Sequence, residues 1–324
     1  MRFIKIIFAV VALVVSGLSL AQGYPSKPVT LVVPAAPGGG TDILGRVFAE
    51  QLKKRLDQPV IVDNKAGASG MIGTHAVAKA APDGHTLLFT YSSPIYYVQH
   101  TFDKVPYDVK RDLDVISEIA TNTMILVVNK DVPAKNMKEF IAWAKKDKGR
   151  LSYGSLGTGS GGHLTAAYLS KIQDLEMIHV PYKSEAPFAQ DLAAGMVPWG
   201  MGTLAPMLPL IQSGKVRPIA VLSNKRLQGL PNVPTMKEEG FPDPELITMS
   251  WFVLAAPAGT PKPILELLEK HAREIAHTPE MKARLEELGM DAVGGSAADF
   301  RRNFDATGPL IEKLVKLSGA RSDK

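Results

Sequence analysis

The chain has 324 residues, of which 45% are hydrophobic, a formal net charge of +5 and no cysteine. The lack of cysteine excludes disulfides, thiolate catalysis and cysteine-ligated metal sites. The positive charge is mild and spread along the chain, so we expect no nucleic-acid partner, which would need a dense basic stripe. The length predicts two domains, because one domain usually takes about 100–200 residues.

The N-terminal segment has the three-part layout of a secretory signal peptide. Arg2 and Lys5 precede an apolar run from Ile6 to Val15, and small residues follow up to Ala21. A membrane anchor is the alternative, but the apolar run is shorter than the roughly 20 residues of a spanning helix. We therefore expect a signal peptide over residues 1–21 and an exported mature chain.

The first part of the mature chain alternates short apolar runs with amphipathic stretches. Apolar residues recur along 41–56 at Leu44, Phe48, Leu52 and Leu56, so one helical stripe faces a sheet. Such alternation predicts parallel strands joined by right-handed crossovers. The expected strands are Val29–Pro34, Val60–Asp63 and Leu87–Tyr91, and the expected helices are Thr41–Leu56 and Gly70–Ala81.

A polar stretch over residues 103–114 separates this part from a second alternating series. A helix capped by Asn136, with Glu139 three residues on, follows the first new strand. Thr260 is the expected N-cap of a helix from Lys262, and Ser296 begins a capping box for the last helix. The expected strands of this series are Met124–Asn129, Leu151–Gly154, Glu176–Val180, Val197–Met201, Val216–Leu222 and Met249–Ala256, with helices at His163–Lys171, Pro187–Ala194 and Leu204–Ser213 and three closing helices from Lys262, Pro279 and Asp299.

The closing helices decide the domain organisation. They need a sheet to cover, and the first sheet has only two crossover helices of its own, so they are expected to return to it. Domain one is then discontinuous, covering residues 22–123 and 250–324, and domain two covers 124–249. The fold class is α/β, with two doubly wound sheets joined by a two-strand hinge and the ligand between the lobes, at the C-terminal ends of the strands.

Two glycine-containing loops follow the first two strands. The first is Pro37-Gly38-Gly39-Gly40-Thr41, and the second contains Ala68-Ser69-Gly70. Glycine lets backbone N–H groups approach a ligand closely, and the first N–H groups of a helix are unpaired and lie at the positive end of its dipole. The two loops are therefore expected to converge on one small acidic group.

A third glycine loop, residues 157–162, matches the GxGxxG pattern of dinucleotide-binding proteins. That pattern needs an acidic residue at the end of the next strand, where this chain has Pro181-Tyr182-Lys183. A carboxylate-binding loop using backbone N–H groups and the hydroxyls of Ser155, Thr158 and Ser160 is the preferred interpretation, and a flexible surface linker stays open. His163 either donates to the anion or is structural.

No motif supplies enzyme chemistry. The chain has no GxSxG serine motif and no P-loop lysine, and its histidines show no HxH or HExxH spacing. We therefore expect no metal, no cofactor and no catalytic residue, and a receptor rather than an enzyme. An extracytoplasmic enzyme and a ligand sensor with the same fold stay open as alternatives.

Seven segments in order resemble the periplasmic receptors of tripartite tricarboxylate transporters, the Bug proteins. They are PGGGTD (37–42), NKAGASG (64–70), YGSLGTGSGGHL (153–164), VPYKSEAPFAQDLAAGMV (180–197), VRPIAVLS (216–223), LPNVPT (230–235) and APAGTPKP (256–263). The resemblance implies a two-lobed type II periplasmic binding-protein fold and a periplasmic monomer. It also implies closure around an organic carboxylate, which is delivered to a membrane permease of one large and one small subunit.

The motifs and the resemblance together give one set of expected ligand-binding residues. On ligand binding, the first two loops hold the proximal carboxylate and the third loop closes over it. The set is Pro37, Gly38, Gly39, Gly40, Thr41, Ala68, Ser69, Gly70, Ser92, Ser155, Thr158, Gly159, Ser160, His163, Tyr182, Lys183 and Gly202.

Departures from the family pattern bear on specificity. Ala35 stands where the family usually has an aromatic residue, and Gly202 stands where it commonly has an acid. With Trp199 and Met201 nearby, we expect a distal pocket for an aromatic or medium-chain carboxylate or dicarboxylate, rather than for an acidic amino acid.

Overall fold

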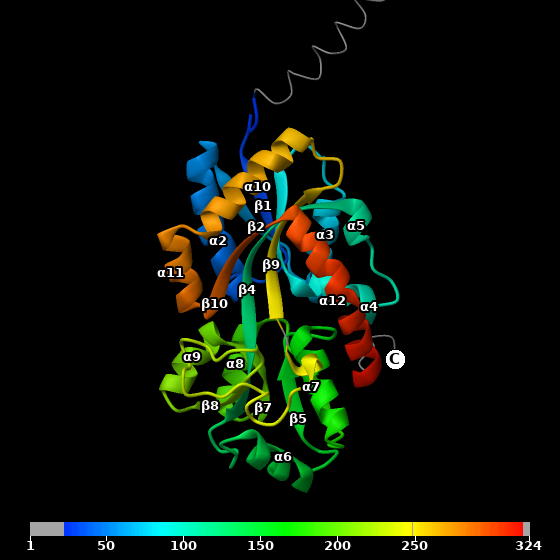
Figure 1. Cartoon of the computed structure of the whole chain (residues 1–324), viewed down its shortest axis with the longest axis vertical. Coiled ribbons are helices and arrows are strands. Elements are labelled where there is room, and N and C mark those ends of the chain that lie inside the picture. The colour runs from blue at the N-terminus through cyan, green and yellow to red at the C-terminus, as the bar shows by residue number, and fades with distance from the viewer. Residues whose placement is uncertain (1–22, 248, 320–324) are drawn as a thin grey trace, which may run out of the picture.

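The computed structural model describes residues 23–247 and 249–319. The expected signal peptide over residues 1–21 lies outside these described residues. The described chain forms two lobes stacked along the long axis of the molecule, and α12 (Ala297–Ser318) runs past their junction (Figure 1). Among the described residues, none of the helices is long and apolar enough to cross a membrane.

The first lobe is built on a mixed sheet with strand order β2, β1, β3, β9, β4 and with β10 on the far side of β4. The pairs β1–β2 and β1–β3 are parallel, as expected, whereas β9, β4 and β10 are antiparallel to their neighbours. The strands are β1 (Val29–Val33), β2 (Val60–Asn64), β3 (Thr86–Tyr91), β4 (Leu113–Asn129), β9 (Met249–Pro257) and β10 (Met290–Ser296).

Helices cover both faces of this sheet. Buried residues of α2, α10 and α11 form one hydrophobic core with one face, and α3 and α12 contribute to the core on the other. The C-terminal helices therefore return to the first sheet, as expected from the sequence. The helical segments are α2 (Gly40–Leu56), η1 (Ala68–Gly70), α3 (Met71–Ala78), η2 (Ser93–Tyr97), α4 (Val98–Thr101), α5 (Val109–Asp112), α10 (Lys262–Ala276) and α11 (Pro279–Glu287).

The second lobe continues from the other end of β4. There β4 pairs antiparallel with β7 and β8, and β5 lies parallel to both β7 and β6. A separate core, which includes Phe188, Leu192 and Met207, fills the space between this sheet and α8 and α9. The elements are α6 (Met137–Lys146), β5 (Ser152–Ser155), α7 (Gly161–Ile172), β6 (Ile178–Pro181), α8 (Glu185–Ala194), β7 (Trp199–Thr203), α9 (Leu204–Gln212), β8 (Val216–Val221) and η3 (Pro244–Leu246).

Strand β4 is a strand of both sheets, and the sequence-based prediction of its start at Met124 is wrong. The strand begins at Leu113, and the added residues pair with β9 from Leu113↔Pro257 to Thr123↔Met249. This half of β4, residues 113–123, carries several buried polar side chains, a composition more typical of a loop than of a strand. Some of them are paired within the lobe: Ser117 Oγ, for example, donates to the Gly295 carbonyl at 2.6 Å.

Two further predictions at the C-terminal end need correction. Thr260 does not cap α10, because its hydroxyl donates to the Pro257 carbonyl at 2.7 Å and Pro261 occupies the N-cap position. Strand β10 was not expected, since two glycines and a register shift interrupt its pattern. The capping box at Ser296 and the cap at Asn136 are both confirmed.

Candidate functional site

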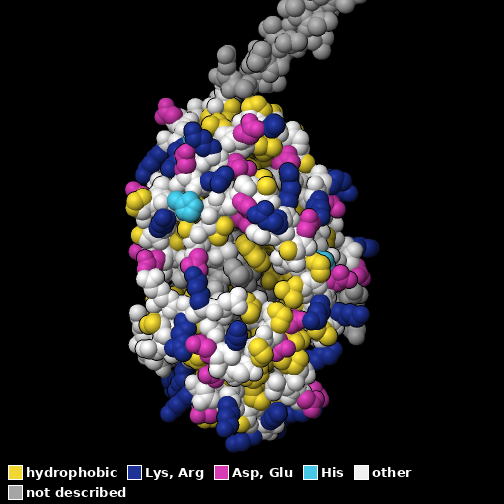
Figure 2. Space-filling model, in the orientation of Figure 1, with side chains coloured by type: hydrophobic (Ala, Val, Ile, Leu, Met, Phe, Trp, Pro, Cys, Tyr) yellow, Lys and Arg dark blue, Asp and Glu magenta, His cyan; other side chains and the backbone are white. Residues whose placement is uncertain are grey.

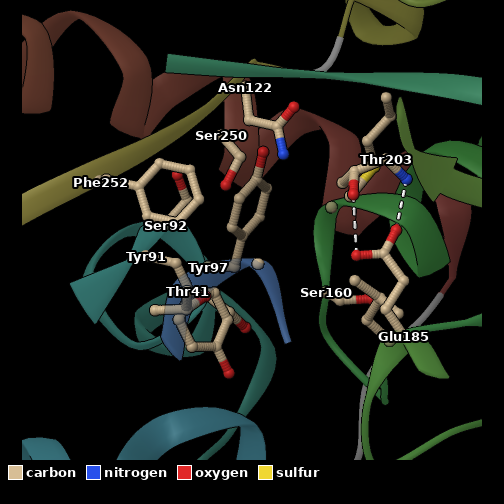
Figure 3. A pocket seen from close by; sticks show the side chains of 15 residues that line it. Thr41, Tyr91, Ser92, Tyr97, Asn122, Ser160, Glu185, Thr203, Ser250 and Phe252 are labelled. Carbon is tan, nitrogen blue, oxygen red and sulfur yellow. Dashed lines mark hydrogen bonds between the residues drawn. The ribbon is translucent and has the colours of Figure 1, made fainter. Parts of the chain in front are cut away.

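A pocket lies where β4 and β9 pass the junction of the lobes. Asn122 and Met124 come from the middle of β4, and Ser250 and Phe252 from the start of β9 (Figure 3). The first lobe adds the start of α2 and the end of β3, and the second lobe adds the starts of α7 and α8. The lining residues are Gly40, Thr41, Tyr91, Ser92, Ser93, Tyr97, Asn122, Met124, Leu156, Ser160, Gly161, Glu185, Thr203, Ser250 and Phe252.

The N-terminus of α2 opens onto this pocket through Gly40 and Thr41. Its N-cap residue, Gly39, supplies no side-chain cap, so the first-turn N–H groups depend on other partners. Asp42 fixes the preceding loop instead, because its Oδ2 accepts from the Gly38 N–H at 2.9 Å and from Arg46 Nε at 3.0 Å. The result is a hydrogen-bonded turn that leads into α2, whose first two residues line the pocket.

Asp42 is itself almost fully buried, which raises the pKa of a carboxyl group. The hydrogen bonds from Arg46, Gly38 and Asn64 outweigh burial and hold the pKa of Asp42 below its ordinary value. The negative charge of Asp42 is therefore paired within the first lobe, where it fixes the loop before α2.

The N-terminus of α7 opens onto the same pocket from the second lobe. Ser160 is its N-cap, and the Ser160 hydroxyl accepts from the His163 N–H at 3.2 Å. Gly161, the first helical residue, lines the pocket beside Ser160. Two helix N-termini, one from each lobe, thus bring their unpaired N–H groups to one site, which is an arrangement that favours an anion.

A buried pair of histidines lies behind this helix start. The rings of His163 and His179 stack with centroids 3.7 Å apart, and His163 Nδ1 accepts from the Gly159 N–H at 3.0 Å. His179 Nε2 lies 2.6 Å from Ser155 Oγ. Burial lowers the pKa of His163 to about 4, and burial together with His163 lowers the pKa of His179 to about 3. Both rings are therefore neutral at neutral pH.

Glu185 is the one carboxylic acid among the lining residues. It begins α8, is 7% exposed, and accepts hydrogen bonds on both carboxylate oxygens from Thr203, one from the backbone N–H and one from the hydroxyl at 2.8 Å (Figure 3). Burial raises the pKa of Glu185 and the two Thr203 donors lower it, with burial the larger effect.

The remaining wall is largely aromatic and apolar. Tyr91, Tyr97 and Phe252 form one side, and Met124 and Leu156 complete it. Burial raises the pKa of Tyr91 to about 12, so this phenol is a neutral hydrogen-bonding group. The lining contains no lysine, arginine or histidine, and the described residues contain no cluster of side chains suited to a metal ion.

Only part of the predicted site lines this pocket: Gly40, Thr41, Ser92 and Ser160. The other residues of the first loop, Pro37, Gly38 and Gly39, come just before the start of α2.

The second loop meets the third at the edge of the lobes. Ala68 and Gly70 lie on either side of Ser69 in η1, and Ser69 Oγ donates to the Thr158 carbonyl at 2.9 Å. Gly159 lies beside Thr101 of α4. Ser69, Thr158 and Gly159 therefore form contacts between the lobes, and none of these predicted residues lines the pocket.

The other five predicted residues lie elsewhere in the second lobe and do not line the pocket either. Ser155 is fully buried, and His163 contacts His179 and Gly159. The Tyr182 hydroxyl donates to Asp191 at 2.9 Å, and Lys183 is exposed. A side chain at Gly202 would meet Met207 and Phe188 in the core of the second lobe.

The four residues used to infer a distal pocket also lie elsewhere. Trp199 and Met201 are fully buried, Gly202 faces the core, and Ala35 packs against the core of the first lobe. The reasoning from these positions to the size of the ligand is therefore wrong. The apolar wall of the pocket comes instead from Tyr91 at the end of β3, Tyr97 in η2 and Phe252 near the start of β9.

Sequence reasoning missed most of the lining. Asn122 was lost because the start of β4 was predicted too late. Glu185 belongs to the segment 180–197, two residues after Lys183. A glutamate among apolar and small residues at the start of a helix could have indicated that this position lines a site. Tyr97, in the irregular turn η2, had no such signal.

Comparison with known proteins places the chain in a family. The model of the tripartite tricarboxylate transporter family receptor matches residues 44–316. The protein BugT of Bordetella pertussis is 37% identical over 78% of this chain and 78% of its own length.

Two solved structures resemble the whole described fold. The R. palustris protein Rpa4515, solved with adipate, is 34% identical over 92% of this chain and 99% of its own, with a TM-score of 0.87. The periplasmic binding protein BugD is 31% identical over 92% of this chain and 99% of its own, with a TM-score of 0.85. The predicted two-lobed periplasmic binding-protein fold is confirmed by these neighbours. The sequence of this chain, its fold and the extent of the match show that it belongs to the tripartite tricarboxylate transporter receptor family and is a Bug-type solute-binding protein.

Proposed function

We propose that the chain is a periplasmic receptor that binds a small organic carboxylate between its lobes. The observation that carries this proposal is that α2 of one lobe and α7 of the other direct their N-termini into one pocket. Backbone N–H groups at the positive ends of two helix dipoles hold an anion without a cationic side chain. The lining accordingly has no lysine or arginine.

The relatives support the same ligand class. Rpa4515, similar in sequence and fold, was solved with adipate. The wall of Tyr91, Tyr97 and Phe252 suits the apolar body of a ligand, as small-molecule pockets usually combine such a wall with few polar groups. We infer an aromatic or medium-chain carboxylate.

Delivery to a membrane permease of one large and one small subunit completes the proposed role. In this proposal, one lobe comprises residues 22–123 and 250–324 and the other comprises residues 124–249. The two lobes move about β4. The chain is secreted through the signal peptide 1–21 and acts as a monomer. The contact between Ser69 and Thr158 then belongs to the closed form that the permease recognises. The loops around Ala68 and Gly159 act as its closing edges.

A charge at the start of α2 tests the proposal. Thr41→Asp adds a carboxylate in the first turn of the helix, where it favours the helix but repels a bound carboxylate. Thr41→Asn is the neutral control of the same shape. The ligand for this test is whichever of adipate, succinate, benzoate and citrate binds the natural chain. We expect calorimetric titration with that ligand to show that binding is lost in Thr41→Asp and kept in Thr41→Asn. We expect the melting temperatures of both variants without ligand to be unchanged. Equal affinity in both variants would contradict the proposal.

A further inference from the structure

Glu185 has no role in the anion site described above, and its charge is unusual there. The two helix N-termini favour a ligand carboxylate, yet a second carboxylate, that of Glu185, forms part of the same wall. Its position is fixed, because Thr203 donates to each of its oxygens. The side chain therefore does not turn away from the pocket without breaking two hydrogen bonds.

No cation in the lining balances this acid. The described salt bridges do not include Glu185, and the lining has no lysine, arginine or histidine. A buried carboxylate without a cation is costly unless hydrogen-bond donors surround it. Each ionised oxygen accepts more than one hydrogen bond, so Glu185 retains acceptor capacity beyond its bonds to Thr203.

Asn122 lines the same pocket but does not add an acceptor to it. Its Oδ1 is enclosed, whereas its amide nitrogen is directed toward the Tyr97 side of the pocket (Figure 3). Glu185 therefore supplies the side-chain acceptors at this end of the space that the ligand fills.

We propose that Glu185 selects the end of the ligand remote from its carboxylate, and that this end carries N–H or O–H donors. The ligand class is then an amino- or hydroxycarboxylate of medium length, or an aromatic carboxylate with such a group. A second carboxylate at this end would meet the Glu185 carboxylate and is disfavoured. This inference rests on the proposed function, because the proximal carboxylate fixes which end points toward Glu185.

Ligands matched in length test this selection. The probes are three sets, each with a dicarboxylate, a hydroxycarboxylate and an aminocarboxylate: succinate, 4-hydroxybutyrate and 4-aminobutyrate; adipate, 6-hydroxyhexanoate and 6-aminohexanoate; and terephthalate, 4-hydroxybenzoate and 4-aminobenzoate. Calorimetric titration of the natural chain gives the affinity of each. In the set that fits best, we expect the donor-bearing ligand to bind at least about tenfold more tightly than the dicarboxylate, as a hydrogen bond to a charged group warrants.

Glu185→Gln removes the charge and keeps the shape. We expect this variant to lose most of that preference, with the ratio of dissociation constants falling about tenfold. Glu245→Gln is the matched control, because Glu245 is 3% exposed, pairs with Lys313 and does not line this pocket. It should leave the ratio unchanged. Melting without ligand confirms that both variants are folded.

The outcomes separate the two proposals. A natural chain that prefers the dicarboxylate, or a preference that survives Glu185→Gln, overturns the selection by Glu185 and leaves the carboxylate receptor standing. Failure of every carboxylate in the three sets, and of benzoate and citrate as well, to bind the natural chain overturns the proposed function, and the selection with it.

Discussion

Ser69 of the first lobe and Thr158 of the second are joined across the junction by a hydrogen bond of 2.9 Å, from the Ser69 hydroxyl to the Thr158 carbonyl. Ser69 has a left-handed backbone conformation (φ 53°), which directs the short η1 turn toward the other lobe. The helix α12 links the lobes independently, packing against both β4 and α7. The hydrogen bond between Ser69 and Thr158 can therefore change when the lobes close, while α12 keeps its contacts with both lobes.

Ser69→Ala removes the hydrogen bond across the junction. We expect a roughly two- to tenfold weaker affinity for the carboxylate, since one hydrogen bond contributes about 0.5–1.5 kcal/mol. Titration calorimetry measures this change. Ser213→Ala, which removes an exposed bond within the second lobe to the Leu210 carbonyl, should have no effect. Unchanged affinity in Ser69→Ala would show that the contact plays no part in the bound state.

The stacked histidines predict a loss of stability in acid. The ordinary histidine pKa is 6.5, and the folded values of about 4 for His163 and about 3 for His179 lie below it. Between these values the unfolded chain binds protons that the folded chain does not, so the free energy of unfolding falls as the pH drops from 6.5 toward 3.

Denaturant unfolding between pH 7 and pH 4 checks this dependence. His163→Phe keeps an aromatic ring on His179 and removes one titrating group, so its stability should depend less on pH. His277→Gln, at an exposed histidine, serves as the control. A natural chain with the same free energy of unfolding at pH 7 and pH 4 would contradict the prediction.

Gly200 is required by the packing of β7 against β5 and α8. A Cβ atom there would collide with the Gly154 carbonyl and would lie 2.6 Å from Phe188 Cζ. Gly200→Ala should therefore destabilise the chain by about 1–3 kcal/mol, as overpacking does. Gly23→Ala, with nothing within 4 Å, is the control. Equal melting temperatures for the two variants would refute this packing argument.

Tyr96 stabilises a buried acid in the first lobe. Its hydroxyl donates to Glu118 Oε1 at 3.0 Å, while Asn303 donates to Oε2 at 2.7 Å. Tyr96→Phe leaves one oxygen without that donor and should lower the free energy of unfolding by about 1–3 kcal/mol. Tyr24→Phe, which loses a bond to the Gly84 carbonyl at a half-buried site, should cost less. The reverse order in urea denaturation would contradict the account.

The sequence predicts the fold better than the site, for physical reasons. Local periodicity places β1 and α2, whose loop is fixed by neighbouring residues such as Asp42. Asn122 reaches the pocket only because β4 crosses both lobes, which depends on pairing with β9, distant in sequence. Whether Gly202 faces the pocket or the core depends on the strand's register and its contact with Phe188, and the sequence does not specify these.

The central claim is that the pocket between the lobes binds a carboxylate group. The most direct measurement is calorimetric titration of the chain with mono-, di- and tricarboxylates, each paired with the primary amide of the same shape. We predict one carboxylate bound per chain and at least about a hundredfold weaker binding of its amide, or about 2.7 kcal/mol. Equal binding of acid and amide, or binding of none of the acids, would contradict the account.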